Sequence, residues 1–380
     1  MPRSKRAEAK RARTRVRYAV AGLGHIAQVA VLPAFAHAKR NSELVALVSD
    51  DPKKLEKLSR RQRAVARCAH YSEYDDLLES GEIDAVYIAL PNHMHREYAM
   101  RAAVAGVHVL CEKPLALTVP ECEEMIDAAE DGGVQLMTAY RLHFDPANLR
   151  AREVARPGGP LGEVRYFSTQ FSQQVVDGNV RLDRHAGGGP LYDIGIYCIN
   201  AARYIFGAEP DEVFAVRATG SDPRFREVDE MVAGVLRFPG ERLAEFTVSF
   251  GAADVSAYRV VGTKGDLVVE PAYDYAAGLK HRLTLKGKTR TRAFPRTDQF
   301  AAELLHFSDC VLGDRPPEPS GLEGLIDVAV IQALQQSADT GAPVSLALPR
   351  RSHRPGPELA TRRPPVQKKP ATFHANASTR

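Results

Sequence analysis

Short apolar runs alternate with amphipathic segments along the first 140 residues of the chain. The runs end in polar residues or glycine, as strands buried in a parallel sheet do, and the segments between them have helical spacing. Strands are predicted at Arg17–Ala21, Glu43–Asp50, Ile83–Leu90, Val107–Cys111 and Val134–Tyr140, and helices at Tyr74–Leu78, Arg96–Ala105 and Pro120–Asp131. This alternation predicts a doubly wound α/β domain with a parallel sheet.

From about residue 141 the pattern changes to successive strands separated by turns such as Pro239-Gly240. The predicted strands are Glu163–Gln173, Val213–Thr219, Met231–Phe238, Arg242–Phe250, Ala257–Val261 and Asp266–Glu270. They favour a meander over a βαβ series, and so an α+β domain with an open, mainly antiparallel sheet. A second apolar face on such a sheet often forms a subunit interface, so we expect a homodimer or homotetramer.

Composition places two basic tails outside these domains. Residues 1–17 and 350–380 each hold eight Lys or Arg against one acid, which leaves 35 basic and 45 acidic residues, a net charge of −10, between them. The tails are poor in apolar residues, so we expect disorder at 1–15 and 350–380, flanking domains at 16–140 and 141–347. No motif that recognises nucleic-acid sequence lies between the tails, so the tails predict no specific nucleic-acid partner.

The sequence lacks the signals of a disulfide framework, a metal site, a membrane span and a secretion signal. Five cysteines without C-x-x-C spacing indicate reduced thiols, and His93 and His95 have no neighbouring ligand that would complete a metal site. No apolar run approaches the roughly 18 residues of a membrane span, and the N-terminus has no apolar core of a secretion signal. We therefore expect a cytoplasmic protein without a metal.

A glycine-rich turn follows the first predicted strand. Gly22-Leu23-Gly24-His25-Ile26-Ala27 is the G-x-G-x-x-A form of the Rossmann fingerprint, and a helical pattern begins directly after it. Gly22 permits the tight turn, Gly24 lets the backbone approach a pyrophosphate, and Ala27 allows the helix to pack closely on the strand. The motif predicts a dinucleotide site at the start of this helix.

The end of the second strand distinguishes NADP from NAD. An acid at this point bonds the ribose 2′-hydroxyl of NAD, whereas a small hydroxyl with a cation leaves room for the 2′-phosphate of NADP. Here the turn begins with Ser49 and is followed by Lys53 and Lys54, which favours NADP. Asp50 and Asp51 weaken that preference, because either carboxylate could turn toward the ribose.

The strand Val107–Cys111 runs into Glu112-Lys113-Pro114. Open α/β sheets bind ligands at the carboxyl ends of their strands, and the proline fixes an extended backbone at Lys113. Lys113 is thus a candidate for chemistry, although a solvated strand end would look the same. Pro91-Asn92 ends another strand at this edge, so both segments should border a nicotinamide.

A second candidate element begins at Gly187-Gly188-Gly189-Pro190, which opens a helix. Asp193 and Tyr197 stand four residues apart, on one face of that helix, an arrangement that suits recognition of a hydroxylated substrate. The alternative is that Asp193 only favours the helix dipole and Tyr197 only packs. Spacing alone does not choose between them.

Together these motifs resemble the Gfo/Idh/MocA oxidoreductases, and most closely their glucose-fructose oxidoreductase branch. The similarity rests on Gly22–Ala27, Cys111–Ala116, Tyr140–His143 and Gly187–Tyr197, and extends from about residue 16 to 347. It implies a Rossmann domain, a sheet domain, a tightly held NADP and a sugar or polyol substrate between them. The segment Arg181–Ala186 differs slightly from the relatives.

The resemblance also implies roles for individual residues. Lys113, Asp193 and Tyr197 would form the catalytic set, and Ser49, Lys54 and Tyr71 would contact the ribose phosphate. Tyrosine in place of the histidine of many relatives points to the aldose dehydrogenase side of the family. Further cofactor contacts would come from His25, Ile26, Leu90, Pro91, Asn92, His95, Glu112 and Arg141, in addition to Gly22, Gly24, Ala27 and Lys113.

The resulting hypothesis is reversible hydride transfer between the nicotinamide and a hydroxyl-bearing carbon. Tyr197 would accept the proton with Lys113 as the cation that favours the phenolate, and Asp193 would orient the substrate hydroxyl. Lys113 as the base is the alternative mechanism. Alternative functions are a reductase of dihydrodiol, imine or amino-sugar substrates, and a nonenzymatic dinucleotide-binding sensor.

Overall fold

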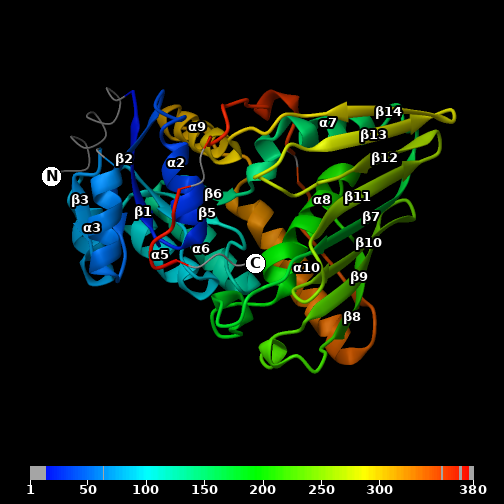
Figure 1. Ribbon diagram of the computed structural model, residues 1–380, viewed down its shortest axis with the longest axis horizontal. Coiled ribbons are helices and arrows are strands. Elements are labelled where there is room, and N and C mark those ends of the chain that lie inside the picture. The colour runs from blue at the N-terminus through cyan, green and yellow to red at the C-terminus, as the bar shows by residue number, and fades with distance from the viewer. Residues whose placement is uncertain (1–13, 63, 352–353, 368–369, 376–380) are drawn as a thin grey trace.

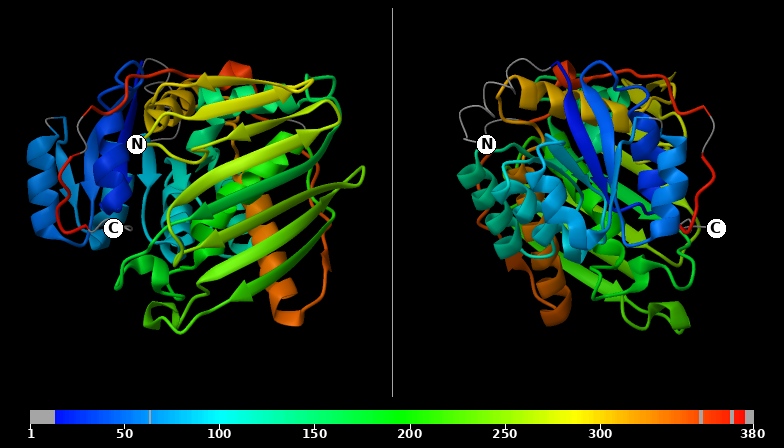
Figure 2. Two further views of the ribbon diagram at one scale, coloured as in Figure 1. Left: turned by 45° about the vertical axis from the view of Figure 1, so that its right-hand side comes forward. Right: turned by 90° about the vertical axis from the view of Figure 1, so that its left-hand side faces the viewer.

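Two β-sheets stand beside each other in the computed structural model, which describes residues 14–62, 64–351, 354–367 and 370–375 (Figure 1). The expected disorder of residues 1–13 lies outside this range. The smaller sheet is flanked by helices, and the larger one has helices on one face only (Figure 2). We call them the parallel sheet and the large sheet.

Within the described residues the parallel sheet has six strands in the order β3-β2-β1-β4-β5-β6. All of its pairings are parallel, and the order reverses direction after β1, as in a doubly wound fold. The strands are β1 (Val16–Ala21), β2 (Ser42–Val48), β3 (Arg67–Ala69), β4 (Ala85–Ile88), β5 (His108–Glu112) and β6 (Leu136–Ala139). The predicted fold of this part is confirmed.

Helices cover both faces of the parallel sheet. The first begins with a π-helical stretch at Ala27–Val31. The others here are α2 (Leu32–Ala34), α3 (Pro52–Arg61), α4 (Tyr74–Glu79), α5 (His95–Val104) and α6 (Val119–Gly132). The sequence pattern did not identify α3, because only Leu55 and Leu58 of its ten residues are buried.

The large sheet follows the order β14-β13-β12-β11-β7-β10-β9-β8-β15 in the described chain. Its pairings are antiparallel except that β10 runs parallel to β7. The strands are β7 (Val164–Ser172), β8 (Glu212–Ala218), β9 (Met231–Phe238), β10 (Arg242–Ser249), β11 (Val255–Gly262), β12 (Gly265–Val269), β13 (Lys280–Leu285), β14 (Lys288–Ala293) and β15 (Val344–Ser345). The open, mainly antiparallel sheet is confirmed, but the simple meander was wrong because β7 lies between β10 and β11.

Four helices accompany the large sheet: α7 (Pro146–Ala155), α8 (Ile196–Phe206), α9 (Gln299–Leu312) and α10 (Gly321–Thr340). The α9 helix returns to the parallel sheet, where Phe300, Leu304 and Phe307 join the core around β1 and β2. The α10 helix belongs to two cores, since Ile326 packs with the parallel sheet and Ile331 with the large sheet. The two sheets are therefore joined by shared helices.

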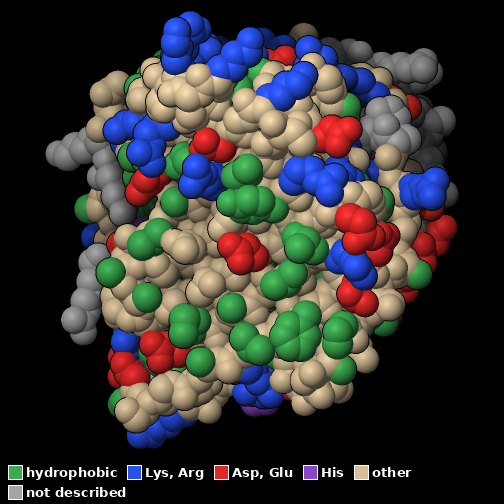
Figure 3. Space-filling view, turned by 90° about the vertical axis from the view of Figure 1, so that its right-hand side faces the viewer, with side chains coloured by type: hydrophobic (Ala, Val, Ile, Leu, Met, Phe, Trp, Pro, Cys, Tyr) green, Lys and Arg blue, Asp and Glu red, His purple; other side chains and the backbone are tan. Residues whose placement is uncertain are grey.

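The other face of the large sheet carries exposed apolar side chains. Figure 3 shows hydrophobic side chains over the middle and lower part of this face, with Lys and Arg along its upper edge. The exposed residues on these strands are Tyr166, Phe214, Val216, Met231, Val235, Leu243 and Val255. Tyr166 pairs with Leu243 across β7 and β10, so the apolar positions are contiguous.

Disorder of residues 350–380 stays a prediction, and the structure describes part of that segment. Residues 354–367 and 370–375, which we call the C-terminal strap, lie along the protein surface (Figures 1 and 2). Near its start, Arg354 pairs with Glu209 at 2.5 Å. Composition predicted disorder because the segment has few apolar residues, whereas the observed contacts are mostly polar and involve distant parts of the chain.

Candidate active site

The glycine turn joins β1 to the first helix. Gly22 has a φ of +90°, and a Cβ there would lie 2.4 Å from the carbonyl oxygen of Ala89, so the turn requires glycine. A Cβ on Gly24 would meet no atom within 4 Å, which leaves open space in front of the helix start. A pyrophosphate could approach the backbone there, so these residues fit a dinucleotide.

The turn after β2 brings together the residues that were predicted to contact the ribose phosphate of the cofactor. Ser49 is buried, and its side chain is hydrogen-bonded with Tyr71. Burial, reinforced by the charge of Asp50, raises the pKa of Tyr71, so its hydroxyl keeps its proton. Asp51 caps α3 by accepting a hydrogen bond from the Lys54 backbone amide at 2.9 Å.

His95, which was predicted to contact the cofactor, lies inside the protein between two loops. The side chain is fully buried, and its ring nitrogens lie 2.8 Å from the carbonyl oxygen of Pro114 and 2.9 Å from that of Leu90. It therefore holds together the loops that follow β4 and β5, and has no surface with which to touch a cofactor. The sequence motif could not separate a contact residue from one that supports contact residues.

Lys113 lies at the end of β5, before a cis peptide bond to Pro114. Its Nζ donates to the backbone oxygen of Asp193 at 2.7 Å and to Oδ1 at 3.0 Å. Burial alone would lower the pKa of Lys113, but the negative charge of Asp193 and the neighbouring Tyr197 and Glu112 outweigh it and raise the pKa. Lys113 is held as an ammonium.

Asp193 lies in the π-helical turn Leu191–Gly195 that leads into α8. Besides Lys113, its carboxylate accepts hydrogen bonds from Arg181 Nε at 2.6 Å and Gln173 Nε2 at 3.3 Å. Burial would raise the pKa of Asp193, yet Arg181 and Lys113 together lower it well below its usual range. The carboxylate is ionised and fully engaged by protein donors.

Tyr197 lies one turn further along α8, beside two cations. Lys113 Nζ is 4.9 Å from the centre of its ring, and the Arg141 guanidinium is 5.0 Å from the same point. Arg141 is buried and fixed by hydrogen bonds to Gln299 at 2.5 Å and to the Tyr273 carbonyl at 2.6 Å. The structure thus brings the three predicted catalytic side chains together.

Sequence models of one family match both parts of the chain. The "Oxidoreductase family, NAD-binding Rossmann fold" model of Gfo/Idh/MocA matches residues 16–140, and the Gfo/Idh/MocA C-terminal domain model matches residues 148–268. A D-xylose 1-dehydrogenase (NADP⁺) of Haloferax volcanii is 36% identical over 280 residues, which cover 73% of this chain and 84% of that protein. The chain belongs to the Gfo/Idh/MocA oxidoreductase family.

Solved structures agree with this Gfo/Idh/MocA assignment. An aldose-aldose oxidoreductase from Caulobacter crescentus, complexed with glycerol, is 39% identical with a TM-score of 0.83, covering 87% of this chain and 100% of that one. A 3-ketoreductase from Actinomadura kijaniata, in complex with NADP and TDP-benzene, is 27% identical with a TM-score of 0.78, covering 85% and 98%. The predicted family and oxidoreductase class are confirmed.

Sequence reasoning missed two residues of this Gfo/Idh/MocA site, Arg181 and Gln173. They come from separate segments, the short helical turn Val180–Leu182 and the end of β7, and meet only at Asp193. The available signal was the unusual stretch Arg181–Ala186 before the glycine loop. That loop is itself tied to the parallel sheet, because Asn92 Nδ2 donates to the Gly187 carbonyl at 2.8 Å.

Other predicted contacts surround this centre. Glu112 is half-buried and accepts a hydrogen bond from the Tyr87 hydroxyl at 2.8 Å. Burial raises the pKa of Glu112 despite the opposing effect of Lys113. His25 and Ile26 are half-buried at the helix start, as are Pro91 and Asn92 after β4, whereas Leu90 is buried.

Among residues 14–62, 64–351, 354–367 and 370–375, no group of three or more His, Cys, Asp or Glu could hold a metal ion. Within the same ranges no helix has the length and apolar character needed to cross a bilayer.

Proposed function

We propose that this protein is an NADP-dependent dehydrogenase of sugars or polyols that acts on a carbon bearing a hydroxyl, with the anomeric carbon of an aldose as the favoured target. Relatives named as NADP⁺-dependent xylose dehydrogenases and as an aldose-aldose oxidoreductase support the substrate class. Ser49 and Lys54 at the ribose turn support NADP, and the open space at Gly24 suits its pyrophosphate.

The observation that carries the proposal is the contact of Lys113 with both Asp193 and Tyr197 at the carboxyl end of β5. Ligands of open α/β sheets bind at this edge. When bound, NADP accepts or returns a hydride at C4 of its nicotinamide. A phenol, an ammonium and an ionised carboxylate lie together at this edge. Such a set of groups can transfer the proton of the substrate and orient its hydroxyl.

Tyr197 is the proposed proton carrier. During oxidation Tyr197 in its phenolate form takes the proton of the substrate hydroxyl, the C=O bond forms, and the hydrogen on that carbon leaves with its electron pair as the hydride that the cofactor takes up. In the reverse direction the Tyr197 phenol returns the proton to the carbonyl oxygen and becomes the phenolate again. Lys113 and Arg141, which lie 4.9 and 5.0 Å from the ring centre, favour the negative oxygen that both directions require.

Lys113 is proposed as the cation rather than the base. A lysine base must lose its proton, and the charge of Asp193 favours the ammonium form against the opposing effect of burial. Asp193 holds Lys113 and Arg181 at the cleft, so it acts on the substrate mainly through them. This assignment favours the first of the two mechanisms considered for the sequence.

The test of this proposal is absorbance spectroscopy of the purified protein mixed with NADP and a panel of aldoses. We expect growth of the reduced-nicotinamide band with at least one aldose, and a loss of kcat of at least about 100-fold in Tyr197→Phe with NADPH affinity unchanged. Tyr204→Phe removes a phenol from the same helix, where its hydroxyl bonds Asn148, and should keep near-normal kcat.

Two results would contradict the proposal. If no nicotinamide cofactor binds, the oxidoreductase function itself fails. If Tyr197→Phe keeps normal turnover while Lys113→Met abolishes it with NADPH still bound, the proton carrier is Lys113.

We also propose that the protein is a homo-oligomer joined through the apolar face of the large sheet. Seven exposed apolar residues on adjacent strands support this. Leu243→Lys, which places a charge on a 49% exposed site there, should lower the mass measured by light scattering, whereas Val104→Lys, at a 79% exposed site on α5, should not. An unchanged mass for both would refute this interface.

The proposed compartment is the cytoplasm. All five cysteines lie in the described chain and are free, as expected in a reducing environment.

A further inference from the structure

The described parts of the C-terminal strap are hydrogen-bonded to the rest of the protein at several points. Asp298 donates its amide to the carbonyl of Arg363 at 3.1 Å, and the Arg296 guanidinium donates to that of Val366 at 2.7 Å. Further on, Arg61 of α3 donates to the Ala371 carbonyl at 2.8 Å. The strap therefore passes from α9 to α3, on the outer side of the parallel sheet (Figure 2).

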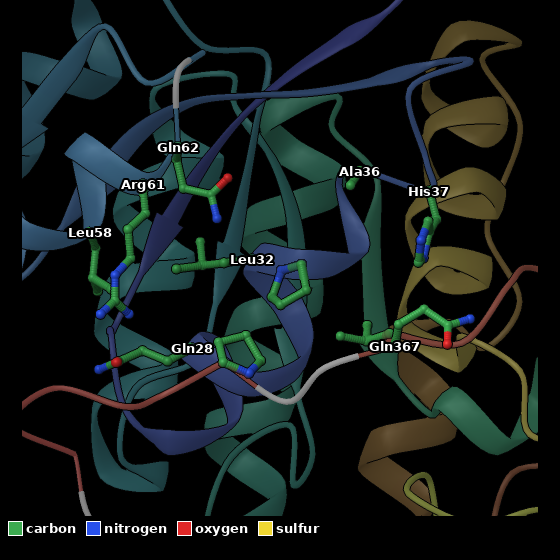
Figure 4. Close-up of a pocket in the computed structure, with 11 residues that line it drawn as sticks. Gln28, Leu32, Ala36, His37, Leu58, Arg61, Gln62 and Gln367 are labelled. Atoms are coloured by element: carbon green, nitrogen blue, oxygen red, sulfur yellow. The ribbon is translucent and has the colours of Figure 1, made fainter.

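A cavity of about 410 Å³ lies beneath the middle of the strap. Figure 4 shows Gln367 of the strap at one side of it, with Leu32, Arg61 and Gln28 around the rest. The strap thus spans the groove between the first helix and α3. Both elements begin at the edge where the dinucleotide turn lies, so the groove leads to that site.

Phe373 docks at the end of this groove. Its amide donates to Gln28 Oε1 at 2.8 Å, and Gln28 Nε2 donates to its carbonyl at 2.9 Å. The same Gln28 nitrogen donates to the carbonyl of Leu23, in the glycine turn, at 2.9 Å. Lys57 lies over the Phe373 ring with its Nζ 3.9 Å from the ring centre. The strap is therefore connected to the dinucleotide turn through the side chain of Gln28.

His374 completes the docking at the ribose turn. Its Nδ1 donates to Asp51 Oδ2 at 2.6 Å, and its ring stacks on Phe373 with 3.9 Å between ring centres. The other oxygen of Asp51 accepts from the Lys54 amide. The Asp51 side chain is 24% exposed, and both of its oxygens accept hydrogen bonds from protein donors.

This contact bears on the choice of cofactor. A free carboxylate just after the second strand binds the ribose 2′-hydroxyl of NAD and repels the 2′-phosphate of NADP. We infer that the C-terminal strap is part of the cofactor site, where His374 occupies Asp51 and so favours NADP over NAD. This inference rests on the proposed function, since it assumes that a nicotinamide dinucleotide binds at the glycine turn.

The neighbouring acid provides a matched control. Asp50 is exposed and accepts a hydrogen bond from Ser49 at 3.4 Å, whereas the strap contact that defines the inference belongs to Asp51. Asn at position 51 can still cap α3 but no longer carries the charge. A double-variant cycle therefore separates the strap's effect on Asp51 from any general effect at this turn.

The experiment measures binding of NADPH and NADH to the full chain by titrating the fluorescence of the reduced nicotinamide. His374→Ala should lower the ratio of NADPH to NADH affinity about two- to fivefold, the value of a half-exposed ion pair. A chain ending at residue 369 should show the same direction. Thr372→Ala, beside the docked residues, should leave the ratio unchanged.

In an Asp51→Asn background, His374→Ala should no longer change the ratio of NADPH to NADH affinity. In an Asp50→Asn background, His374→Ala should still lower that ratio. An unchanged ratio in both His374→Ala and the shortened chain would overturn the inference while leaving the proposed function intact. Tighter NADPH binding by the shortened chain would also overturn it, because the strap would then block the site. If the full chain binds neither nucleotide, the proposed function fails first.

Discussion

Replacing Asp193 with Asn should destabilise the protein and change the ionisation of its site. The carboxylate pairs with Lys113 at 3.0 Å and with Arg181 at 2.6 Å, and these side chains are 10% and 31% exposed. Removing one partner of a buried ion pair costs about 3–5 kcal/mol, because the remaining charge stays buried. Since Arg181 is partly screened by solvent, we expect a loss of about 2 kcal/mol in the free energy of unfolding.

The same change should lower the pKa of Lys113. Asp193 supplies the main attraction that offsets burial of the ammonium, so without it burial dominates. Because the folded pKa of Asp193 is depressed, its stabilising effect is complete at neutral pH and is lost only as the pH falls through the acid range. Measurements near pH 7.5 therefore capture the whole effect on stability.

Urea unfolding tests the predicted loss of stability, and the pH dependence of kcat/KM tests the predicted change in the pKa of Lys113. The alkaline decline of activity should begin at a lower pH in Asp193→Asn than in the original chain. Asp177→Asn, an exposed carboxylate in a nearby loop, should change the unfolding free energy by less than about 0.5 kcal/mol. If Asp193→Asn also changes it by less than that, with the same alkaline limb, the argument from buried charge is refuted.

Two further predictions concern stability. Burial lowers the pKa of His281 to about 4, so stability should fall as pH drops from about 6.5 toward 4, by up to about 1.4 kcal/mol per pH unit from this group. His281→Leu should make the slope of unfolding free energy against pH shallower, and exposed His185→Leu should not; equal slopes would contradict this. Gly22→Ala should cost about 3 kcal/mol in thermal unfolding because of its clash with Ala89, whereas Gly81→Ala, also at positive φ but with no atom within 4 Å, should cost about 1 kcal/mol. Equal costs would show that the contact is unimportant.

Five of the six strands that the described chain contributes to the parallel sheet could be predicted, because each is a short buried run with local turn signals. The sequence did not indicate β3, which has three residues of which only Ala69 is buried. The β5 run, for example, ends at Glu112, one residue beyond the predicted Cys111. Pairing between strands distant in sequence is different, since nothing in the sequence around β7 indicates that β10 will lie beside it. The order of the large sheet depends on how separate segments meet after folding.

The residues of the candidate site also divide into those with a local sequence signal and those whose position depends on the folded chain. Lys113, Asp193 and Tyr197 carried motif signals, and their proximity agrees with the spacing argument. Arg181 had no such signal, because its approach to Asp193 depends on the conformation of the loop that precedes the glycines. His95 also carried a motif signal, but the motif does not show that its side chain is buried.

The geometry of the candidate site depends on the packing of the two sheets. Lys113 belongs to the parallel sheet and Asp193 to the helix beside the large sheet, so their 3.0 Å contact exists only when the sheets are correctly placed. The α10 helix fixes that placement by contributing to both cores. A substitution at Ile326 or Ile331 should therefore alter catalysis through the separation of Lys113 from Asp193, although both side chains are fully buried in the cores.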